Sequence, residues 1–254
     1  MQLSRAAIVT GASSGIGRAT ALRLAQDGDQ ILAVGRDIAS LRTVCDEIVA
    51  RGGVALPFAA DVTADAAPKR IVAEALKQFR QIDVVVNAAG IIASGTVEST
   101  TDEAWDVMMS VNVRAPFRLL REAAAELTRT KGAVVNVSSV TGTRAFPGVL
   151  AYCVSKSAVD QLTRCAALEM AASGVRVNAV NPGVVVTNLH RRGGMDVEKY
   201  AAFLEHAKAT HPMGRPGTPE EIAELIHFLA SPASGWITGV TANIDGGRHL
   251  TCLR

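Results

Sequence analysis

The chain has 254 residues, of which 48% are hydrophobic and 20% charged, so it can bury a sizeable core and lies far from the composition of disordered chains. Its 26 basic and 24 acidic residues leave a formal net charge of +2, with no basic face or acidic tail that would indicate nucleic acid as a partner. No stretch approaches the roughly 20 apolar residues that cross a bilayer, and the first residues leave no room for a signal peptide, so we expect a cytoplasmic protein that contacts no membrane.

Cysteine and histidine spacing gives no indication of a metal site or a disulfide framework. The cysteines show neither CxxC nor Cys/His ligand spacing, and the histidines at 190, 206 and 211 also lack it. We therefore expect reduced thiols, surface histidines and no bound metal.

Short apolar runs alternate with longer stretches of helical periodicity along the whole chain. The runs cover residues 7–10, 31–34, 54–59, 84–87, 133–137, 175–180 and 238–244. The helical stretches cover residues 15–27, 39–51, 66–79, 103–127, 151–173 and 219–229. Repeated strand–helix–strand units predict an α/β, Rossmann-type doubly wound fold, in which a seven-stranded parallel sheet carries helices on both faces. No linker or internal repeat divides the chain, so residues 1–254 are expected to form a single domain.

The first apolar run ends in a glycine-rich loop that leads directly into a helix. Its sequence is Thr10-Gly11-Ala12-Ser13-Ser14-Gly15-Ile16-Gly17. Glycines at such a turn allow the backbone to approach a pyrophosphate, and the start of the following helix supplies free N–H groups for it. This context predicts a dinucleotide site that includes Gly11, Ser13, Ser14, Gly15, Ile16 and Gly17.

The second run ends in Gly35-Arg36-Asp37, where a side chain would meet the adenosine ribose. A carboxylate there would bind the 2′-hydroxyl of NAD, whereas an arginine would accommodate the 2′-phosphate of NADP. Asp37 has a second interpretation as the N-cap of the next helix, which leaves Arg36 to contact the phosphate. Ser14 lacks the second positive charge that many NADP enzymes carry before the glycine, although Ser13 or Ser14 can add a hydroxyl contact. We therefore favour NADP(H), with NAD(H) as the alternative.

Tyr152 and Lys156 open a helical stretch, and their spacing of four places them on one face of the helix, one turn apart. A phenol with an ordinary pKa of ~10 is a poor acid or base at neutral pH unless its anion is stabilised, which a lysine and a cationic nicotinamide ring can do. Ser139 follows the run 133–137 and can donate a hydrogen bond to a substrate oxygen. These three residues are the candidate catalytic group.

Residues 188–213 interrupt the alternation with a mostly polar insert that contains one helical stretch, 197–208. Ligands in doubly wound sheets bind beyond the carboxyl ends of the strands, so this insert is a candidate substrate lid, with a surface loop as the alternative. Its arginines, Arg191 and Arg192, can select substrates that carry an anionic group.

Together these motifs resemble the short-chain dehydrogenase/reductase family along the whole chain. The family's TGxxxGIG element matches residues 10–17, its adenine-binding aspartate matches Asp61-Val62, and its NNAG element matches residues 87–90 with Ala88 in place of the second asparagine. Its PGxxxT segment, which holds the nicotinamide carboxamide, matches residues 182–187. The resemblance implies further cofactor contacts from Asp61, Val62, Asn87, Ala88, Gly90, Pro182, Gly183, Val185 and Thr187, as well as from Tyr152 and Lys156.

The resemblance also implies the catalytic roles. Ser139 rather than Ser138 matches the catalytic serine, because the family places it thirteen residues before the tyrosine, and Asn112 matches a fourth member that holds a water linking Lys156 to solvent. The resemblance implies an oxidoreductase that moves a hydride between NAD(P)(H) and a carbonyl or secondary alcohol, on a 3-oxoacyl thioester, ketone, or sugar or polyol. It also implies a homotetramer. A nicotinamide-binding sensor and a lyase or epimerase on the same fold are the alternatives.

Overall fold

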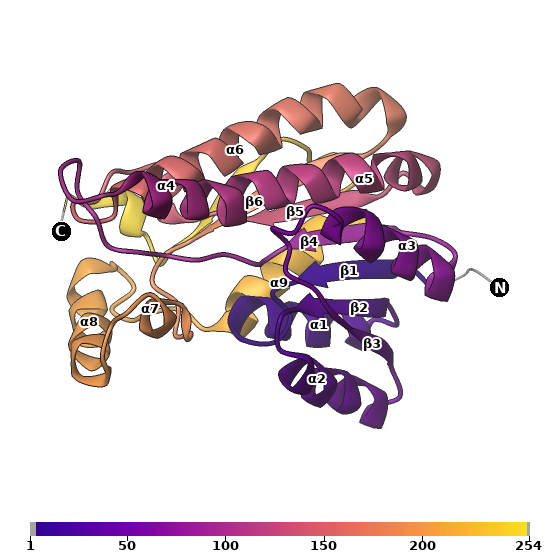
Figure 1. The fold of residues 1–254 in the computed structure, drawn as a ribbon, viewed down its shortest axis with the longest axis horizontal. Coiled ribbons are helices and arrows are strands. Elements are labelled where there is room, and N and C mark those ends of the chain that lie inside the picture. The colour runs from indigo at the N-terminus through magenta and orange to yellow at the C-terminus, as the bar shows by residue number, and fades with distance from the viewer. Residues whose placement is uncertain (1–3, 253–254) are drawn as a thin grey trace.

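The computed structural model describes residues 4–252 and contains one sheet of seven parallel strands (Figure 1). The strand order is β3-β2-β1-β4-β5-β6-β7, with parallel pairing throughout. The order reverses between β1 and β4, which opens a crevice at the carboxyl ends of these two strands. The strands are β1 (Ala6–Thr10), β2 (Gln30–Gly35), β3 (Val54–Ala59), β4 (Val84–Asn87), β5 (Ala133–Val137), β6 (Arg176–Pro182) and β7 (Thr241–Ile244). The predicted seven-stranded Rossmann-type sheet is confirmed.

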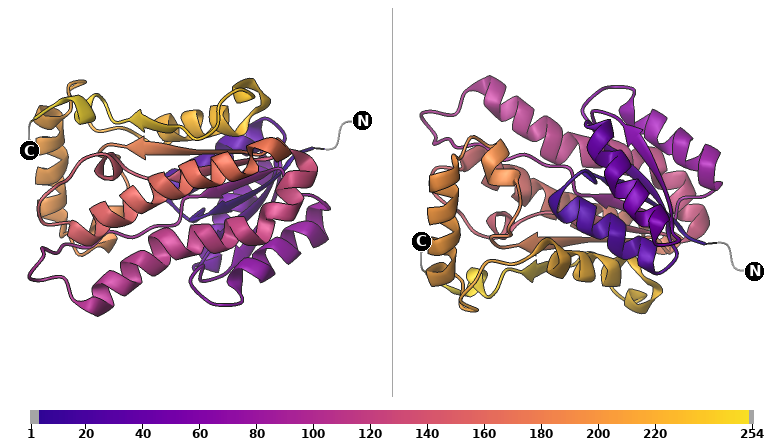
Figure 2. Two further views of the ribbon diagram at one scale, coloured as in Figure 1. Left: turned by 90° about the horizontal axis from the view of Figure 1, so that it is seen from above. Right: turned by 90° about the horizontal axis from the view of Figure 1, so that it is seen from below.

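Helices cover both faces of this sheet, as Figure 2 shows from above and below. One face carries α1 (Gly15–Gln26), α2 (Ile38–Ala50) and α9 (Pro219–Ala230). The other carries α3 (Ala67–Phe79), α5 (Ala115–Thr130) and α6 (Leu150–Met170). The remaining α-helices are α4 (Asp102–Met109), α7 (Leu189–Arg192) and α8 (Val197–Thr210).

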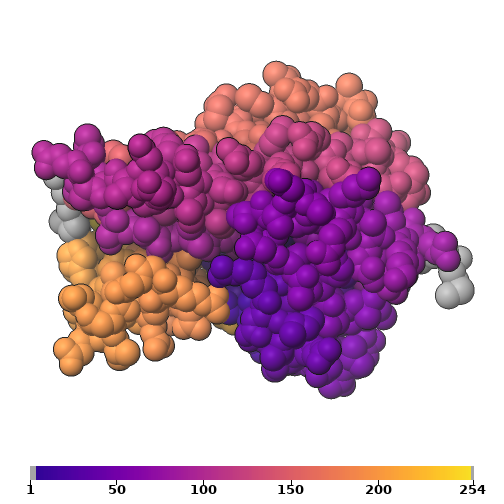
Figure 3. Space-filling model, in the orientation of Figure 1, coloured from indigo at the N-terminus to yellow at the C-terminus, as the bar shows by residue number. Residues whose placement is uncertain are grey.

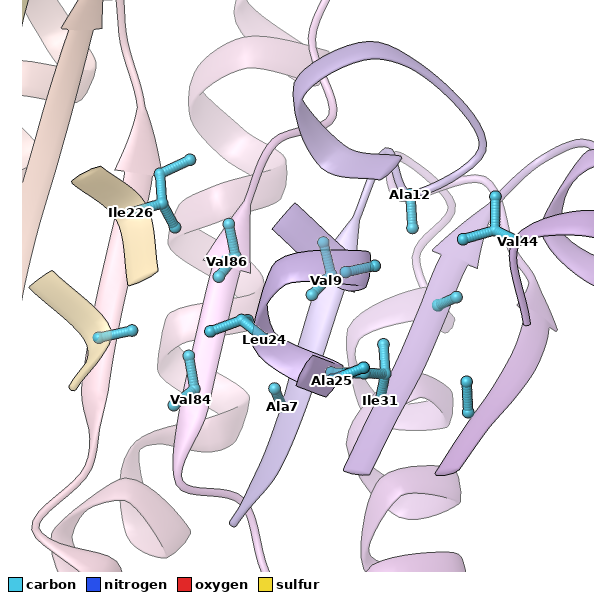
Figure 4. Close-up of a cluster of buried hydrophobic side chains, with 14 of the residues drawn as sticks. Ala7, Val9, Ala12, Leu24, Ala25, Ile31, Val44, Val84, Val86 and Ile226 are labelled. Carbon is cyan, nitrogen blue, oxygen red and sulfur yellow. The ribbon is translucent and has the colours of Figure 1, made fainter. Parts of the chain in front are cut away.

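Successive side chains of the strands enter opposite hydrophobic cores. Ala7 and Val9 of β1 pack with Leu24 of α1 in one core, which Figure 4 shows in close-up. Ile8, between them, packs into the other core with Ile71 of α3. This double burial explains why the strands read as continuous apolar runs rather than as alternating patterns.

The helix predicted over residues 103–127 is in fact interrupted, and the single-helix prediction is wrong. A π-helical segment, Ser110–Arg114, separates α4 from α5. Pro116 has no N–H, so the helical hydrogen bond to the carbonyl four residues earlier, that of Asn112, cannot form. The residue before it, Ala115, donates its N–H to Ser110 O, five residues earlier, which is the π-helical pattern. The irregular turn therefore lies at Asn112, one of the predicted site residues.

Two other expected boundaries also change. The strand predicted from 238 begins at Thr241, because Gly239 has a φ of +78°, which lies outside the strand region. The Asn178 side chain holds the turn before the strand: its Nδ2 donates to Ile237 O and its Oδ1 accepts from Val240 N. The insert contains two helices, α7 and α8, where one was expected. Among residues 4–252, no helix is long and apolar enough to span a membrane.

Candidate active site

The predicted site residues gather at the edge of the sheet where the strands end. The loops after β1, β4, β5 and β6 meet there, together with the start of α6 and the π-helical segment. The insert lies across the same edge: both views in Figure 2 show α8 standing beyond the end of the sheet. Figure 3 shows the insert, in orange, beside the indigo start of the chain.

The glycine-rich loop has the geometry needed to receive a diphosphate. Gly11 and Gly15 have φ values of +68° and +54°, which disfavour any side chain. A Cβ at Gly17 would lie 2.3 Å from Gly11 O, so only glycine lets α1 start so close to the turn. The Ser14 side chain makes no capping bond at the start of α1, and the helix N–H groups therefore remain available to an anion.

Thr10 connects this loop to the turn after β4. Its hydroxyl oxygen accepts hydrogen bonds from Ala88 N (3.1 Å) and Ala89 N (3.2 Å). Asn87, in contrast, directs its amide into the sheet, where it donates to Asn136 Oδ1 at 2.9 Å. The turn at residues 87–90 is therefore held against the glycine loop by its own backbone N–H groups and the Thr10 hydroxyl.

Asp61 follows β3 and lies near the predicted adenosine site. Its carboxylate accepts hydrogen bonds from Thr63 N and Thr63 Oγ1 at 2.9 and 2.7 Å. These bonds lower the pKa of Asp61, and the positive charge of Arg36 adds to the effect. Val62, next to it, lines a small cavity together with Thr10 at the end of β1, Asn87 at the end of β4 and residues of α3 and α5.

Ser139, Tyr152 and Lys156 lie together, and their side chains are almost fully buried. Their residues are 7%, 6% and 5% exposed. The Nζ atom of Lys156 donates to Val137 O at 2.8 Å and lies 5.6 Å from the centroid of the Tyr152 ring. The hydroxyl of Ser139 faces the Tyr152 phenol and accepts a bond from Thr141 N at 3.1 Å.

Burial sets the ionisation of this group. It raises the pKa of Tyr152 to about 12, and the hydrogen bond with Ser139 opposes the rise. It lowers the pKa of Lys156 to about 8, and the nearby carboxylate of Asp160 opposes the fall. At neutral pH the pair is therefore a neutral phenol beside an ammonium group, which is the state that can donate a proton to a developing alkoxide.

The two adjacent serines have different environments. Ser138 Oγ donates to Lys156 O at 3.1 Å and lies near the buried Asp160 carboxylate, which accepts from Asn181 Nδ2 at 2.9 Å. Ser138 therefore supports α6 from behind, whereas Ser139 faces Tyr152. This difference supports the choice of Ser139 as the catalytic serine. The Asp160 cluster was not anticipated from the sequence, since nothing local marks a helical aspartate as buried.

Asn112 is fixed by the π-helical turn described above. Its Oδ1 accepts from Ile91 N at 2.9 Å, and its Nδ2 donates to Ile91 O at 3.0 Å and Ser155 Oγ at 3.0 Å. A Cβ at Gly90 would lie 3.4 Å from Asn112 Oδ1 and 3.7 Å from Lys156 Nζ. Gly90 thus leaves a narrow space onto which both side chains face.

The insert holds the segment 182–187 through two residues, Tyr200 and His211, that were not expected to belong to the site. The Tyr200 hydroxyl donates to Thr187 O at 2.8 Å and accepts from Thr187 N at 3.1 Å. His211 Nε2 accepts from Val184 N at 3.1 Å. His211 is only 2% exposed, so the surface position expected for it is wrong.

Two contacts place the short helix α7 near the predicted cofactor site. Thr187 Oγ1 accepts from Leu189 N at 3.3 Å, and Arg192 Nη1 donates to Ser14 Oγ at 3.0 Å. Of the two arginines expected to contact substrate, Arg192 therefore faces the glycine-rich loop. Within residues 4–252, no group of three His, Cys, Asp or Glu side chains is arranged to hold a metal ion.

The chain is similar to known proteins in both sequence and fold. Residues 11–249 match the family model described as Enoyl-(Acyl carrier protein) reductase. The chain is 36% identical over 242 residues to a 3-oxoacyl-[acyl-carrier-protein] reductase FabG of Thermotoga maritima, covering 94% of this chain and 96% of that one.

Two solved structures share the fold over nearly their full length. A short-chain dehydrogenase/reductase of unknown function from Caenorhabditis elegans, solved with cofactor, has a TM-score of 0.92 at 34% identity, covering 98% of this chain and 96% of that one. A protein of Beutenbergia cavernae, described provisionally as an NAD(P) dependent gluconate 5-dehydrogenase and carrying NADP at low occupancy, has a TM-score of 0.89 at 37% identity, covering 98% of each chain.

Proposed function

Because this chain belongs to the short-chain dehydrogenase/reductase family of oxidoreductases, we propose that it transfers a hydride between NADP(H) and a carbonyl or secondary alcohol of a small substrate. The observation that carries the proposal is the buried group of Ser139, Tyr152 and Lys156 at the edge of the sheet that also holds the glycine-rich loop. A nicotinamide-binding sensor would have no use for such a group.

The cofactor fits the glycine-rich loop, because the uncapped start of α1 and the side-chain-free turn leave room and N–H groups for a diphosphate. When bound, it supplies or accepts the hydride. Asp61 and Val62 would hold the adenine, and Pro182, Gly183, Val185 and Thr187 the nicotinamide. A Cβ at Gly15 would lie 3.2 Å from Thr187 Cγ2, so the two cofactor segments lie close together.

In the reducing direction Tyr152 donates its phenolic proton to the substrate oxygen. Ser139 hydrogen bonds that oxygen and orients it, which stabilises the charge that develops there. Lys156, cationic at pH 7, favours the tyrosinate that remains and holds the cofactor ribose. Asn112 would hold a water that returns a proton from solvent through Lys156.

The preference for NADP(H) rests on what Asp37 does in the structure. Its Oδ1 accepts hydrogen bonds from Ala39 N and Ser40 N, and its Oδ2 accepts one from Ser40 Oγ, so both oxygens serve as the N-cap of α2. The carboxylate is thus engaged, while Gly35 puts no side chain into the space at the end of β2, where a Cβ would be in ordinary van der Waals contact with Leu41 Cδ2 at 3.5 Å. Arg36 is the side chain that supplies a positive charge beside that space.

The test is a panel of 3-oxoacyl thioesters, ketones, sugars and polyols, followed at the nicotinamide absorbance with NADPH and with NADH. A steady-state change in absorbance distinguishes a dehydrogenase from a lyase or epimerase, which would regenerate its cofactor. Arg36→Glu should raise the KM for NADPH at least tenfold and spare NADH, since a charge-assisted hydrogen bond contributes about 1.5–3 kcal/mol. A wild-type kcat/KM that is higher with NADH would overturn the cofactor assignment.

The substrate class and the assembly are further parts of this proposal. Residues 91–95 and 141–149 would form the substrate walls, with 188–213 as the lid. A homotetramer is supported by exposed apolar side chains on the two long helices, among them Phe117 on α5 and Leu168 on α6, which is 82% exposed. Light scattering after gel filtration measures the assembly directly. The cytoplasmic location stays a prediction.

A further inference from the structure

The glycine-rich loop has a serine, Ser14, where a second positive charge would complete a phosphate site. Arg36 alone would face a phosphomonoester that carries up to two negative charges. The charge of Arg36 also lies within reach of the Asp61 carboxylate, whose pKa it helps to lower. The residues next to this site in the sequence therefore supply less positive charge than a phosphomonoester carries negative charge.

The insert supplies the missing charge. Arg192 Nη1 donates to Ser14 Oγ at 3.0 Å, although the two residues are 178 positions apart in the chain. A second observation places the same guanidinium near the end of β2: hydrogen bonds from Ser40 lower the pKa of Asp37, and the charge of Arg192 contributes to that lowering. Arg192 therefore lies between the start of α1 and the start of α2, the two segments that border the ribose position.

The surroundings suit a phosphate rather than another group. A Cβ at Gly35 would lie 3.6 Å from Ser13 Oγ, so this hydroxyl borders the same space. Ser14 Oγ accepts the hydrogen bond from Arg192, so its own O–H remains available to donate to a ligand. Asp37, the nearby acid, is committed to capping α2 by three hydrogen bonds. The space thus has hydroxyl and guanidinium donors on its sides, and both oxygens of the Asp37 carboxylate are hydrogen-bonded to the first turn of α2.

We propose that Arg192 is the second cation of the site for the 2′-phosphate of NADP(H), acting with Arg36 and the Ser13 and Ser14 hydroxyls. This inference rests on the proposed function and deepens it, because it assigns the cofactor preference partly to the lid. A planar guanidinium can bind two phosphate oxygens at once, which a serine in the loop cannot do.

The position of Arg192 also couples the phosphate to the lid. Arg192 ends α7, and the next residue, Gly193, lies so close to Ile92 that a Cβ would be 2.7 Å from Ile92 O. Thr187 Oγ1 accepts from Leu189 N at the other end of α7. A phosphate that binds Arg192 therefore stabilises α7 against the 91–92 turn, and NADP(H) closes the pocket more firmly than NAD(H).

The experiment uses two ligands that differ only in the phosphate of interest, 2′,5′-ADP (adenosine 2′,5′-bisphosphate) and 5′-AMP, measured by calorimetry on the intact protein without substrate. The variants are Arg192→Gln and, as a matched control, Arg191→Gln, which removes the same charge from the neighbouring exposed position. We expect Arg192→Gln to weaken the binding of 2′,5′-ADP about tenfold or more and to leave the binding of 5′-AMP unchanged, as the loss of one charge-assisted contact implies. Arg191→Gln should change neither ligand appreciably, and Arg192→Lys should recover part of the affinity.

The other outcomes separate this inference from the proposed function. Equal weakening of both ligands would overturn it and assign Arg192 to the 5′-phosphate that they share, and unchanged binding of both would remove Arg192 from the site. In either case a wild-type preference for 2′,5′-ADP leaves the NADP(H) assignment standing on Arg36. A wild-type protein that binds both ligands equally overturns the assignment itself. Hydrogen exchange adds a test of the coupling: residues 188–213 should exchange more slowly with 2′,5′-ADP than with 5′-AMP, and equal exchange would refute it.

Discussion

Replacing Tyr152 with Phe removes one hydroxyl from a side chain that is 6% exposed. The ring keeps its packing against Met108 and Ala151, so the fold loses only the hydrogen bond with Ser139, a contribution of about 1 kcal/mol. Catalysis loses much more, because so little of the residue is exposed that water cannot readily replace the phenol as the proton donor. General acid catalysis contributes ~10²–10⁴-fold, so kcat should fall by that factor, or about 3–5 kcal/mol in the barrier.

The assay is steady-state reduction at pH 7 with the best substrate of the panel. Thermal unfolding and the affinity for 2′,5′-ADP serve as controls that the variant is folded and binds cofactor fragments. If Tyr152→Phe keeps more than about a tenth of the wild-type kcat, the general-acid estimate fails and another group donates the proton.

The pH dependence of the same reaction provides an independent check. Burial lowers the pKa of Lys156 to about 8, while that of Tyr152 is raised to about 12. In the free enzyme Lys156 is cationic below pH 8 and neutral above it, whereas the phenol stays protonated throughout. We therefore expect kcat/KM for reduction to be level near neutrality and to fall as the pH rises through about 8. A profile that stays level to pH 10 would show that the charge of Lys156 is not needed.

Three further changes test the framework of the site. Gly17→Ala places a Cβ 2.3 Å from Gly11 O, so it should lower the free energy of unfolding by about 1–3 kcal/mol and abolish 2′,5′-ADP binding; calorimetry that finds normal affinity would contradict the loop geometry. Burial lowers the pKa of His211 from 6.5, so its stabilising contact with Val184 is present above pH 6.5 and is lost as the pH falls; urea unfolding should show a smaller acid loss for His211→Asn than for the wild type. Asp37→Ala should cost about 1 kcal/mol as a lost N-cap, with no change in the KM for NADPH, and a selective loss of NADH binding would restore Asp37 to the ribose.

The sequence alone determined the order and type of most elements. Strands buried on both faces are mostly apolar, and that preference is visible in residues 7–9 and 84–86 without any knowledge of their neighbours. Local capping is equally readable: Thr218 caps α9 in a reciprocal bond pattern with Glu221, and Asp37 caps α2. These features depend on residues within about four positions of one another, and the printed chain contains all of them.

Only the tertiary structure determined the features that depend on residues far apart in the sequence. Asn112 lies in a π-helical turn bonded to Ile91, His211 is buried against Val184, and Arg192 reaches Ser14 across 178 positions. Local composition is silent on such contacts, because burial and hydrogen bonding are set by whatever the fold brings alongside. The sequence marks the polar insert as a candidate lid, with a surface loop as the alternative, but does not show which part of the site it touches. The insert contacts the cofactor loop only because the parallel strands bring both segments to the same edge of the sheet.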